Sequence, residues 1–359
     1  MSRHKAKRKT AFTPLGVKLT DEQMAAAEVL CQLHKQIQTL GGLAGTGKTT
    51  LISYLAQHLR NFACCSFTGK AAEVLRCKGV EATTVHSLIY IPIEKGLNGS
   101  PVFMQKDSLD GVKGIIVDEA SMIGPSLYND IVSYNLPVVF VGDHGQLEPV
   151  GEDIHLMKSP DFKLETVHRN AGDIALFAHH LRDGKEASSF RGSPLIKVLQ
   201  KNDCVPYLLE MDQIICAKNE TRVDVNRYIR HLRGEKDDYP VKGDRLISLM
   251  NSSKLGIYNG SQGVVRSVSP SRMSVCFNDR TIKIGYNVNT FNQEKTVRDI
   301  LGAHPLDYAY TITAHKSQGS EWDKVLVLEQ KCDLWDHKRW AYTAASRARN
   351  QLIWVLPAS

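Results

Sequence analysis

Residues 42–49 read Gly-Leu-Ala-Gly-Thr-Gly-Lys-Thr, and this stretch decides the fold because it has the spacing of a phosphate-binding loop. Glycine at Gly42 and Gly47 lets the backbone turn sharply and present its N–H groups to phosphate oxygens. Lys48 is expected to reach the β- and γ-phosphates of a nucleoside triphosphate, and the Thr49 hydroxyl to bind Mg²⁺. The alternative interpretation, a glycine-rich turn without a ligand, leaves the lysine and the threonine unexplained.

The segments on either side of this loop fit a strand and a helix. Apolar and polar residues alternate over 37–40, and four apolar residues follow the loop at helical spacing: Leu51, Ile52, Leu55 and Leu59. A helix that begins at the loop points the positive end of its dipole at the phosphates. Strand-like and helix-like runs then continue at 64–67, 70–76, 115–117 and 138–141. This order predicts the α/β class, with a parallel sheet covered by helices.

The second half begins again near Ala171, with a strand-like run at 214–216 and a helix-like run at 222–232. Its character then changes to four short alternating runs separated by turn residues, at 246–249, 263–268, 273–277 and 281–284. They predict a small antiparallel sheet or barrel inserted into a second α/β domain. The strand–helix–strand order of that domain returns at 325–328, 339–348 and 352–355. A segment rich in Gly, Pro, Asn and Ser, 91–111, is expected to form an inserted hairpin in the first domain.

The composition is that of an ordinary globular protein, and 359 residues are enough for two core-forming domains. No apolar run reaches membrane-spanning length, and the N-terminus does not read as a signal peptide. Eight scattered cysteines form no Cys-x-x-Cys pair, which argues against zinc and for a reducing, cytoplasmic setting. Five of the 45 basic residues lie in the tail 1–13, which leaves 40 basic against 38 acidic residues elsewhere. Two interpretations of this tail stay open: attraction to polyanions, or a solvated tail without a role.

Acidic and amide side chains follow two of the expected strands. Asp118 is predicted to hold Mg²⁺, and Glu119 to polarise an attacking water. Gln146, in the string 142–150, is expected to contact the γ-phosphate. Because the carboxyl ends of parallel strands meet at one edge of a sheet, these side chains are expected beside the phosphate loop. For the string 142–150, a turn stabilised by Asp143 remains an alternative.

Phosphoryl transfer also calls for an arginine that neutralises the charge developing on the transferred group. Arg169 and Arg347 are the candidates. By residue type alone, each is one of many surface arginines.

Read together, nine ordered motifs resemble superfamily 1B helicases, the RecD-like group that includes the Dda-type phage helicases. The motifs span nearly the whole chain: LTDEQ at 19–23, the loop at 42–49, TGKAA at 68–72, TVHSL at 84–88, DEAS at 118–121, the string 142–150, VHR at 167–169, TAHKSQG at 313–319 and YTAASRA at 342–348. The resemblance implies two RecA-like motor domains with ATP and Mg²⁺ in the cleft between them.

The resemblance also implies roles for single residues at that cleft. Gln23 would read the adenine edge, while Gln146 and Arg169 would contact the γ-phosphate. Arg347 would act as an arginine finger from the second domain, and Glu321 would approach the ribose or the γ-phosphate. The implied nucleotide-binding set is Gln23, Gly42, Leu43, Ala44, Gly45, Thr46, Gly47, Lys48, Thr49, Thr50, Gly319, Glu321 and Arg347.

A single-stranded DNA track across both motor domains is implied as well. Its residues would be Thr68, Lys70, Thr84 and His86 from the first domain, Phe103 from a duplex-splitting pin at 91–111, Asn259 from the inserted domain, and Thr313, His315 and Ser317 from the second domain. Three bland interpretations stay open: His86 as a structural histidine, Phe103 as a buried hairpin side chain, and Asn259-Gly260 as a simple hairpin turn.

The organisation implied by the resemblance divides the chain into four parts: a basic tail at 1–13, motor domain 1A at 14–170 with the pin at 91–111, motor domain 2A at 171–245 and 306–359, and an SH3-like domain 2B at 246–305. The implied activity is ATP-driven movement from 5′ to 3′ on single-stranded DNA with unwinding of duplex ahead, in replication, recombination or repair. The implied partners are single-stranded and forked DNA, with a single-strand-binding protein or replisome component as a further one. The implied form is a monomer in a bacterial or phage-infected cytoplasm.

Three alternatives remain at this stage. The chain could be an RNA-directed helicase of the same group, because no residue distinguishes the sugar. It could be an ATP-gated DNA-binding module that never unwinds. A small-molecule kinase with the same phosphate loop is the third, although it gives no account of the string 313–319.

Overall fold

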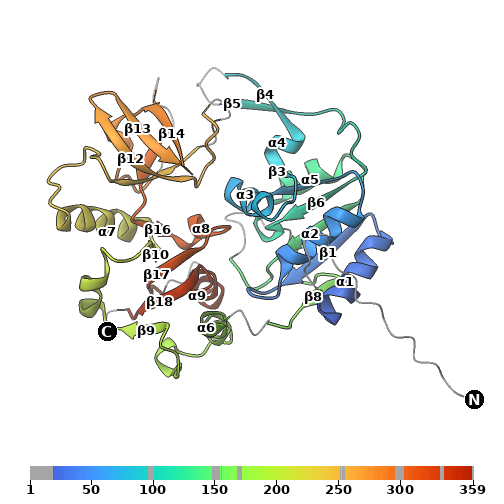
Figure 1. Ribbon diagram of the computed structural model, residues 1–359, viewed down its shortest axis with the longest axis horizontal. Coiled ribbons are helices and arrows are strands. Elements are labelled where there is room, and N and C mark those ends of the chain that lie inside the picture. Colours follow the sequence, from blue (N-terminus) through green and yellow to red (C-terminus); the bar gives the residue numbers. More distant parts are fainter. Residues whose placement is uncertain are drawn as a thin grey trace, which may run out of the picture.

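The computed structural model describes residues 19–95, 101–147, 154, 156–167, 172–250, 252, 255–277, 279–295, 303–331 and 335–357. In these residues the strands form two parallel sheets, one antiparallel sheet and a two-stranded hairpin (Figure 1). The two parallel sheets lie in separate α/β units, which are called the first and the second unit below.

The first unit is built on a six-stranded parallel sheet. Its order is β3 (Ala82–Thr84), β2 (Phe62–Ser66), β6 (Gly114–Asp118), β7 (Val138–Gly142), β1 (Ile37–Gly42) and β8 (Phe162–Leu164). Successive residues of β7 enter different cores: Val139 packs with Leu51 of α2 (Lys48–His58), and Phe140 with Ile131 of α5 (Pro125–Val132). Helices therefore cover both faces, and the predicted parallel sheet is confirmed.

Threonine side chains cap the N-termini of three helices of this unit. Thr20 forms a capping box with Gln23 at the start of α1 (Asp21–Gln32). Thr68 accepts a hydrogen bond from the Ala71 N–H at the start of α3 (Gly69–Cys77), and Thr84 accepts one from the Ser87 N–H at the start of α4 (Val85–Ile89). Because β2 and β3 lead into α3 and α4, the N-termini of these two helices lie at the carboxyl edge of the sheet.

The second unit holds a five-stranded parallel sheet. Its order is β16 (Thr311–Thr313), β10 (Gln213–Cys216), β17 (Trp322–Leu328), β18 (Ala348–Val355) and β9 (Ile196–Leu199). On one face Trp354 packs in a core with α6 (Gly172–Arg182) and α9 (His337–Ala345). On the other face Ile214 and Leu326 pack with Ile229 of α7 (Asn219–Leu232). The second parallel sheet is likewise confirmed.

The expected helix over 339–348 is wrong at its C-terminal end. The helix α9 stops at Ala345, the Ser346 hydroxyl donates to the Thr343 carbonyl oxygen, and Ala348 already belongs to β18, where it is aligned with Trp322. The apolar periodicity continues past Ala345 because the following strand is also buried, so periodicity alone did not mark the end of the helix. As a result, Arg347 lies in the short turn between helix and strand.

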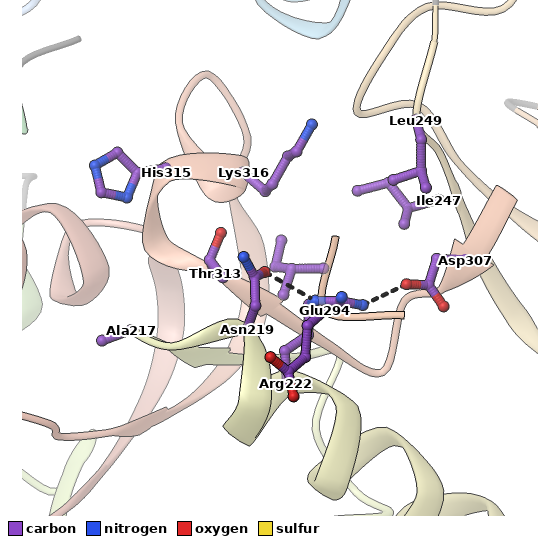
Figure 2. A pocket seen from close by; sticks show the side chains of 11 residues that line it. Ala217, Asn219, Arg222, Ile247, Leu249, Glu294, Asp307, Thr313, His315 and Lys316 are labelled. Atoms are coloured by element: carbon purple, nitrogen blue, oxygen red, sulfur yellow. Dashed lines mark hydrogen bonds and ion pairs between the residues drawn. The ribbon is translucent and has the colours of Figure 1, made fainter. Parts of the chain in front are cut away.

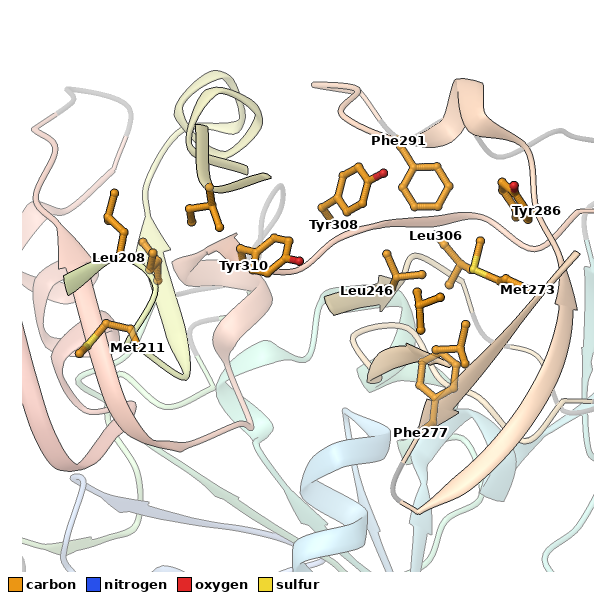
Figure 3. Packing of buried hydrophobic residues seen from close by; sticks show 14 of the residues in the cluster. Leu208, Met211, Leu246, Met273, Phe277, Tyr286, Phe291, Leu306, Tyr308 and Tyr310 are labelled. Atoms are coloured by element: carbon orange, nitrogen blue, oxygen red, sulfur yellow. The ribbon is translucent and has the colours of Figure 1, made fainter. Parts of the chain in front are cut away.

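The antiparallel sheet has the order β14 (Arg280–Gly285), β13 (Arg272–Phe277), β12 (Gln262–Ser269), β11 (Arg245–Ser248) and β15 (Leu306–Tyr308). Its apolar face, including Leu246 and Phe277, belongs to the same buried cluster as Leu326 and Ile353 of the second parallel sheet (Figure 3). The antiparallel sheet and the second parallel sheet thus share one core. Strand β15 also lies beyond the boundary expected at 305.

The hairpin pairs β4 (Tyr90–Lys95) with β5 (Pro101–Gln105) at the top of the first unit in Figure 1. Phe103 is 43% exposed, so it is not a buried hairpin side chain. In the part of the chain that the structure describes, no helix has both the length and the apolar character needed to cross a bilayer.

Candidate nucleotide site and nucleic-acid interface

The phosphate loop connects β1 to α2, as expected. Gly45 and Gly47 have φ angles of 80° and 79°, which glycine adopts without strain. A Cβ on Gly42 would lie 2.7 Å from the Thr46 hydroxyl oxygen and 2.9 Å from Cγ of Lys48. The loop is therefore compact at this position, and a side chain in place of Gly42 would collide with Thr46 and Lys48.

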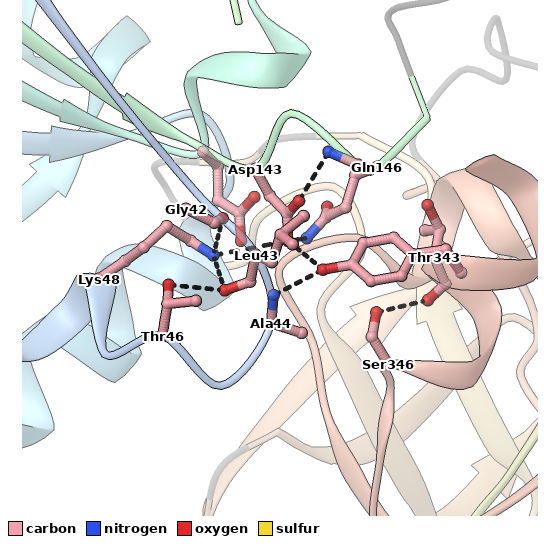
Figure 4. A network of polar contacts seen from close by, with 12 residues as sticks. Gly42, Leu43, Ala44, Thr46, Lys48, Asp143, Gln146, Thr343 and Ser346 are labelled. Atoms are coloured by element: carbon pink, nitrogen blue, oxygen red, sulfur yellow. Dashed lines mark hydrogen bonds and ion pairs between the residues drawn. The ribbon is translucent and has the colours of Figure 1, made fainter. Parts of the chain in front are cut away.

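Lys48 is directed into this loop. Its ammonium donates to the carbonyl oxygens of Gly42 at 2.7 Å and Leu43 at 3.1 Å, and lies 3.5 Å from the Asp143 carboxylate (Figure 4). Thr49 and Thr50 follow in the first turn of α2 and are partly exposed. The loop therefore combines a tight glycine-rich turn with an inward positive charge, a combination suited to a polyphosphate.

Asp118 is the last residue of β6 and Glu119 follows it, and a part of each side chain reaches the surface. Glu119 has a φ angle of 55°, a left-handed conformation that is strained for a residue with a side chain. Burial raises the pKa of Asp118, although the Glu119 N–H and the Lys48 charge oppose this shift. Burial and the Asp118 charge raise the pKa of Glu119 to about 7, against the opposing charges of Arg347 and Lys48. A carboxyl group with a pKa near neutrality is suited to accept a proton from water.

Asp143 and Gln146 come after β7 and are both buried. The Gln146 amide donates to Asp143 at 3.2 Å, and its carbonyl oxygen Oε1 is buried without a hydrogen-bond partner among the described residues. Burial alone would raise the pKa of Asp143, but the Lys48 charge, the Gly145 N–H and the Tyr342 hydroxyl outweigh it and lower that pKa. Asp143 is therefore an ionised centre that holds Lys48 and Gln146.

Residues of α9 and of the turn after it meet this centre from the second unit. The Tyr342 hydroxyl lies 2.5 Å from the Ala44 amide nitrogen and donates to Asp143 at 2.9 Å. The Thr343 hydroxyl accepts from the Leu147 N–H at 3.0 Å. Arg347 is only 5% exposed, and its guanidinium donates to the Thr343 and Ser320 carbonyl oxygens and to the Ser346 hydroxyl. The two units thus meet at the phosphate loop, and the charge of Arg347 is close enough to act on Glu119.

The other residues expected at the nucleotide differ in what they contact. The Gln23 amide is fully buried, accepts from the Thr20 N–H and donates to the Thr46 carbonyl oxygen, so it braces the loop itself. Glu321 forms an exposed ion pair with Arg349, and this arrangement gives no support to its predicted approach to the ribose or γ-phosphate. Gly319 has a φ angle of 73°, and a Cβ there would lie 2.6 Å from the Thr68 hydroxyl oxygen. Arg169 lies outside the described residues.

The first unit presents its expected nucleic-acid residues around the N-termini of α3 and α4. Thr68 and Thr84 cap these helices, and Lys70 is exposed beside Glu73. His86, whose pKa is lowered by burial, lies 5.5 Å from Tyr90 between ring centroids. Tyr90 in turn lies 6.3 Å from Phe103. A line of rings therefore leads from α4 onto the hairpin, a surface on which bases can stack.

The second unit presents Thr313, His315 and Ser317 around the short helix α8 (Ala314–Ser317). Thr313 and His315 line a pocket of about 240 Å³ together with Asn219, Arg222 and Lys316 (Figure 2). Ser317, in contrast, is fully buried and its hydroxyl donates to the Ala314 carbonyl oxygen. Among the three, the structure thus brings Thr313 and His315 to a pocket and keeps Ser317 in the interior.

The antiparallel sheet reaches the first unit through the turn at Tyr258. A Cβ on Gly69 would lie 2.5 Å from the Tyr258 ring, so glycine allows this ring to lie against the start of α3. A second pocket, of about 390 Å³, lies here and includes Lys70 and Tyr258 in its lining. Asn259 accepts a hydrogen bond from Lys316 at 2.9 Å. The turn at Tyr258 and Asn259 therefore contacts both the start of α3 in the first unit and Lys316 in the second.

Sequence reasoning missed several residues of these sites. Asp143 was considered only as a turn residue, and Tyr342 and Tyr258 had no assigned role. The position of Asp143 at the end of a buried strand was a usable signal. Nothing in the sequence indicated that Tyr342 would reach a loop 298 residues away.

Metal ligation gives no further candidates in the described residues, where no group of three or more His, Cys, Asp or Glu side chains is placed to hold an ion. Seven of the cysteines are free thiols, and Cys332 is outside the described ranges.

Comparisons with known proteins agree with this architecture. A family model described as an AAA domain matches residues 18–205, and a model of the UvrD-like helicase C-terminal domain matches 308–355. The ATP-dependent RecD2 DNA helicase of Deinococcus radiodurans is 28% identical over 375 residues, covering 93% of this chain and 48% of the relative. The ATP-dependent DNA helicase dda of Enterobacteria phage T4 is 31% identical over 192 residues, covering 46% of this chain and 43% of the relative.

The chain spans about half the length, or less, of these curated relatives. Among solved structures, a Pif1 helicase from Bacteroides in complex with ADP-AlF3 and ssDNA superposes with a TM-score of 0.61 at 21% identity, covering 95% of both chains. A Pif1 helicase from Candida albicans gives a TM-score of 0.56 at 17% identity, covering 95% of this chain and 96% of the other. At such identities the likeness concerns the fold. The chain belongs to the AAA domain family and, within it, to the RecD-like and Dda-type group of superfamily 1B.

Proposed function

We propose that this protein is an ATP-driven motor that moves 5′ to 3′ on single-stranded DNA and separates duplex DNA ahead of it. One observation carries the proposal: α9 of the second unit, followed by Arg347, meets the phosphate loop and the acid pair of the first unit. A nucleotide bound there would contact both units and could change how they meet.

The residues present fit ATP and Mg²⁺. The tight turn at Gly42 and the inward ammonium of Lys48 would bind a phosphate. The buried Oε1 of Gln146 could accept a hydrogen bond from a water molecule beside it. Thr49 and Asp118 would hold Mg²⁺, which would neutralise charge on the phosphates. Glu119 would accept a proton from the attacking water, and Arg169 with Arg347 would stabilise the transferred phosphoryl group.

Movement would come from alternating grip on the DNA strand. Thr68 and Thr84 would hold backbone phosphates from the first unit, and Thr313 with His315 from the second. These are polar contacts without base selectivity, so binding should be largely independent of sequence and should weaken with salt. Closing and opening of the nucleotide cleft would then change the distance between the two grips.

The proposed preference for DNA is supported by the two named curated relatives, RecD2 and dda, which are DNA helicases. We also infer the domain limits given above, an SH3-like character for the antiparallel sheet, and a duplex-splitting role for the hairpin with exposed Phe103. A single-strand-binding or replisome protein would be a further partner. The same relatives argue for DNA over RNA as the polymer.

Strand displacement on 5′-tailed and 3′-tailed duplexes with ATP and Mg²⁺ tests the proposal. Displacement is expected only with the 5′ tail, and Lys48→Ala should abolish it together with ATP hydrolysis because the phosphate contact is lost. Binding without displacement would favour an ATP-gated module instead. Equal rates with RNA and DNA tails, or a fully active Lys48→Ala variant, would contradict the proposed activity.

A further inference from the structure

The hydroxyl of Tyr342 is one of the groups through which the second unit touches the phosphate loop. His179 of α6 also hydrogen-bonds the Ala44 backbone, and Leu43 of the loop packs in the core of the second unit. The Tyr342 side chain is fully buried, although it comes from α9 of the other unit. Its oxygen accepts from the Ala44 N–H at 2.5 Å, and its proton is donated to Asp143 at 2.9 Å. One hydroxyl group therefore joins a loop amide to the ionised carboxylate that also holds Lys48 and Gln146.

Groups of the protein itself make hydrogen bonds with the loop. The Lys48 ammonium donates to two loop carbonyl oxygens and lies beside Asp143 (Figure 4). The Ala44 N–H donates to the Tyr342 hydroxyl oxygen. In a phosphate-binding loop these are the groups that surround phosphate oxygens. The Tyr342 oxygen is thus an acceptor at a place where a nucleotide would supply one.

The surroundings of the Tyr342 hydroxyl keep this group protonated. Burial and the neighbouring Asp143 carboxylate raise the pKa of Tyr342 far above its ordinary value, so the group remains a neutral phenol. The phenol can then donate to Asp143 and accept from Ala44 at the same time.

We propose that the Tyr342 hydroxyl stands in for a phosphate oxygen at Ala44, so that nucleotide binding must displace it and thereby releases α9 from the loop. This inference rests on the proposed nucleotide site and adds the residue that couples its occupancy to the second unit. Among the described residues, the hydrogen bonds of the Arg347 guanidinium go to groups of its own unit, so a released α9 could be reseated with Arg347 facing the phosphates.

The chain offers a matched control one residue further along α9. Thr343 also makes a hydrogen bond across the boundary between units, to the Leu147 N–H, but it does not touch the phosphate loop. Thr343→Val removes this bond at nearly constant shape. Thr343→Val therefore reports the effect of losing a contact between the units. Tyr342→Phe reports in addition the effect of removing the group that competes with the nucleotide at Ala44.

Titration with a fluorescent ADP analogue tests the inference on the wild-type chain, Tyr342→Phe and Thr343→Val, each checked for folding by thermal melting. Loss of one competing hydrogen bond should tighten binding by about 2- to 13-fold in Tyr342→Phe, with no change in Thr343→Val. Unchanged or weaker binding by a folded Tyr342→Phe variant would overturn the inference. Equal tightening in both variants would overturn it too, because it would reflect general loosening.

A crystal structure of the wild-type protein with ADP gives a readout that does not depend on a variant. The expected result is a nucleotide oxygen bonded to the Ala44 N–H and the Tyr342 hydroxyl withdrawn. A bound nucleotide with the Tyr342–Ala44 bond intact would contradict the inference while leaving the nucleotide site in place. Failure of the wild-type chain to bind ADP at all would instead refute the proposed nucleotide site.

Discussion

The first and the second unit have the same construction, a parallel sheet between helices, but they bring different chemistry to their common boundary. The first supplies the phosphate loop, Asp118, Glu119 and Asp143, while the second supplies Tyr342 and Arg347. In the proposed mechanism neither set is complete for phosphoryl transfer alone, since the finger arginine would come from the second unit and the phosphate loop from the first. Two similar folds have thus become unequal halves of one site.

The same contrast holds for the threonines of the expected nucleic-acid interface. The Thr68 and Thr84 hydroxyls cap helices, so they contribute to the stability of the first unit. Thr313 precedes α8 and its side chain makes no capping hydrogen bond. The second unit therefore carries a threonine whose side chain is not needed to begin its helix.

The largest effect is expected from Arg347→Ala, which tests whether the second unit completes the nucleotide site of the first. Removing the proposed finger arginine should lower kcat for DNA-stimulated ATP hydrolysis by about 10³-fold or more, because Arg347 is the side chain of the second unit that we propose to neutralise the transferred phosphoryl group. Arg349→Ala, two residues on and exposed in its pair with Glu321, should change kcat by less than about two-fold. A kcat within ten-fold of wild type for Arg347→Ala would mean that the second unit does not complete the site.

Glu119→Gln tests the other half. Loss of the proton acceptor should lower kcat by about 10²- to 10⁴-fold, while binding of a fluorescent ADP analogue should be preserved because the loop is unaltered. Single-turnover hydrolysis and equilibrium titration separate these two effects. Full turnover by this variant would remove Glu119 from the mechanism.

A smaller effect is expected from Glu329→Gln. This variant tests whether a largely buried carboxylate makes the stability of the second unit depend on pH. The Glu329 carboxylate, 10% exposed, accepts from His337 at 2.9 Å and from the Trp354 indole at 2.8 Å. Burial alone would raise the pKa of Glu329, but these two hydrogen bonds outweigh it and lower that pKa.

A lowered native pKa contributes stability above the ordinary pKa near 4.5 that is lost as pH falls through the native value. Glu329→Gln should therefore lower the free energy of unfolding by about 1–3 kcal/mol at neutral pH. It should also reduce the fall of the melting temperature as the pH is lowered. Asp323→Asn, at an exposed acid on β17, the strand that Glu329 follows, serves as the control. An unchanged fall of the melting temperature with pH in Glu329→Gln would contradict this account.

The threonine contrast predicts the smallest effects. Thr84→Val should lower the free energy of unfolding by about 1 kcal/mol because a helix cap is lost, and Thr313→Val should change it by less than about 0.5 kcal/mol. Both variants should weaken binding to single-stranded DNA, as measured by fluorescence anisotropy. Equal stability losses would show that the caps do not distinguish the two units, and unchanged DNA affinity in both would remove these threonines from the interface.

Much of this arrangement was predictable from local patterns. The phosphate loop, the acid pair after a buried strand and the alternating runs beyond Leu246 each depend on neighbours within a few residues. Their elements agree with the structure to within a few positions, except that α9 ends at Ala345. Periodicity could not find that end, since a buried helix here runs directly into a buried strand.

Contacts between distant segments were not predictable in this way. The predicted role of Glu321 at the nucleotide came from motif order, yet its side chain pairs with Arg349 at the surface. Ser317 was expected on the DNA track and is fully buried. In both cases the backbone position follows the motif, while the direction of the side chain depends on what packs around it.

The amino-acid order alone was sufficient to specify two parallel sheets, the loop between β1 and α2 and the acids beside it, because these features arise from spacing along a short stretch of chain. Folding in three dimensions was needed to bring Tyr342 onto Ala44 and Arg347 near Glu119. Such contacts join segments hundreds of residues apart, and they form only when two separately packed cores meet, a condition that no local pattern records.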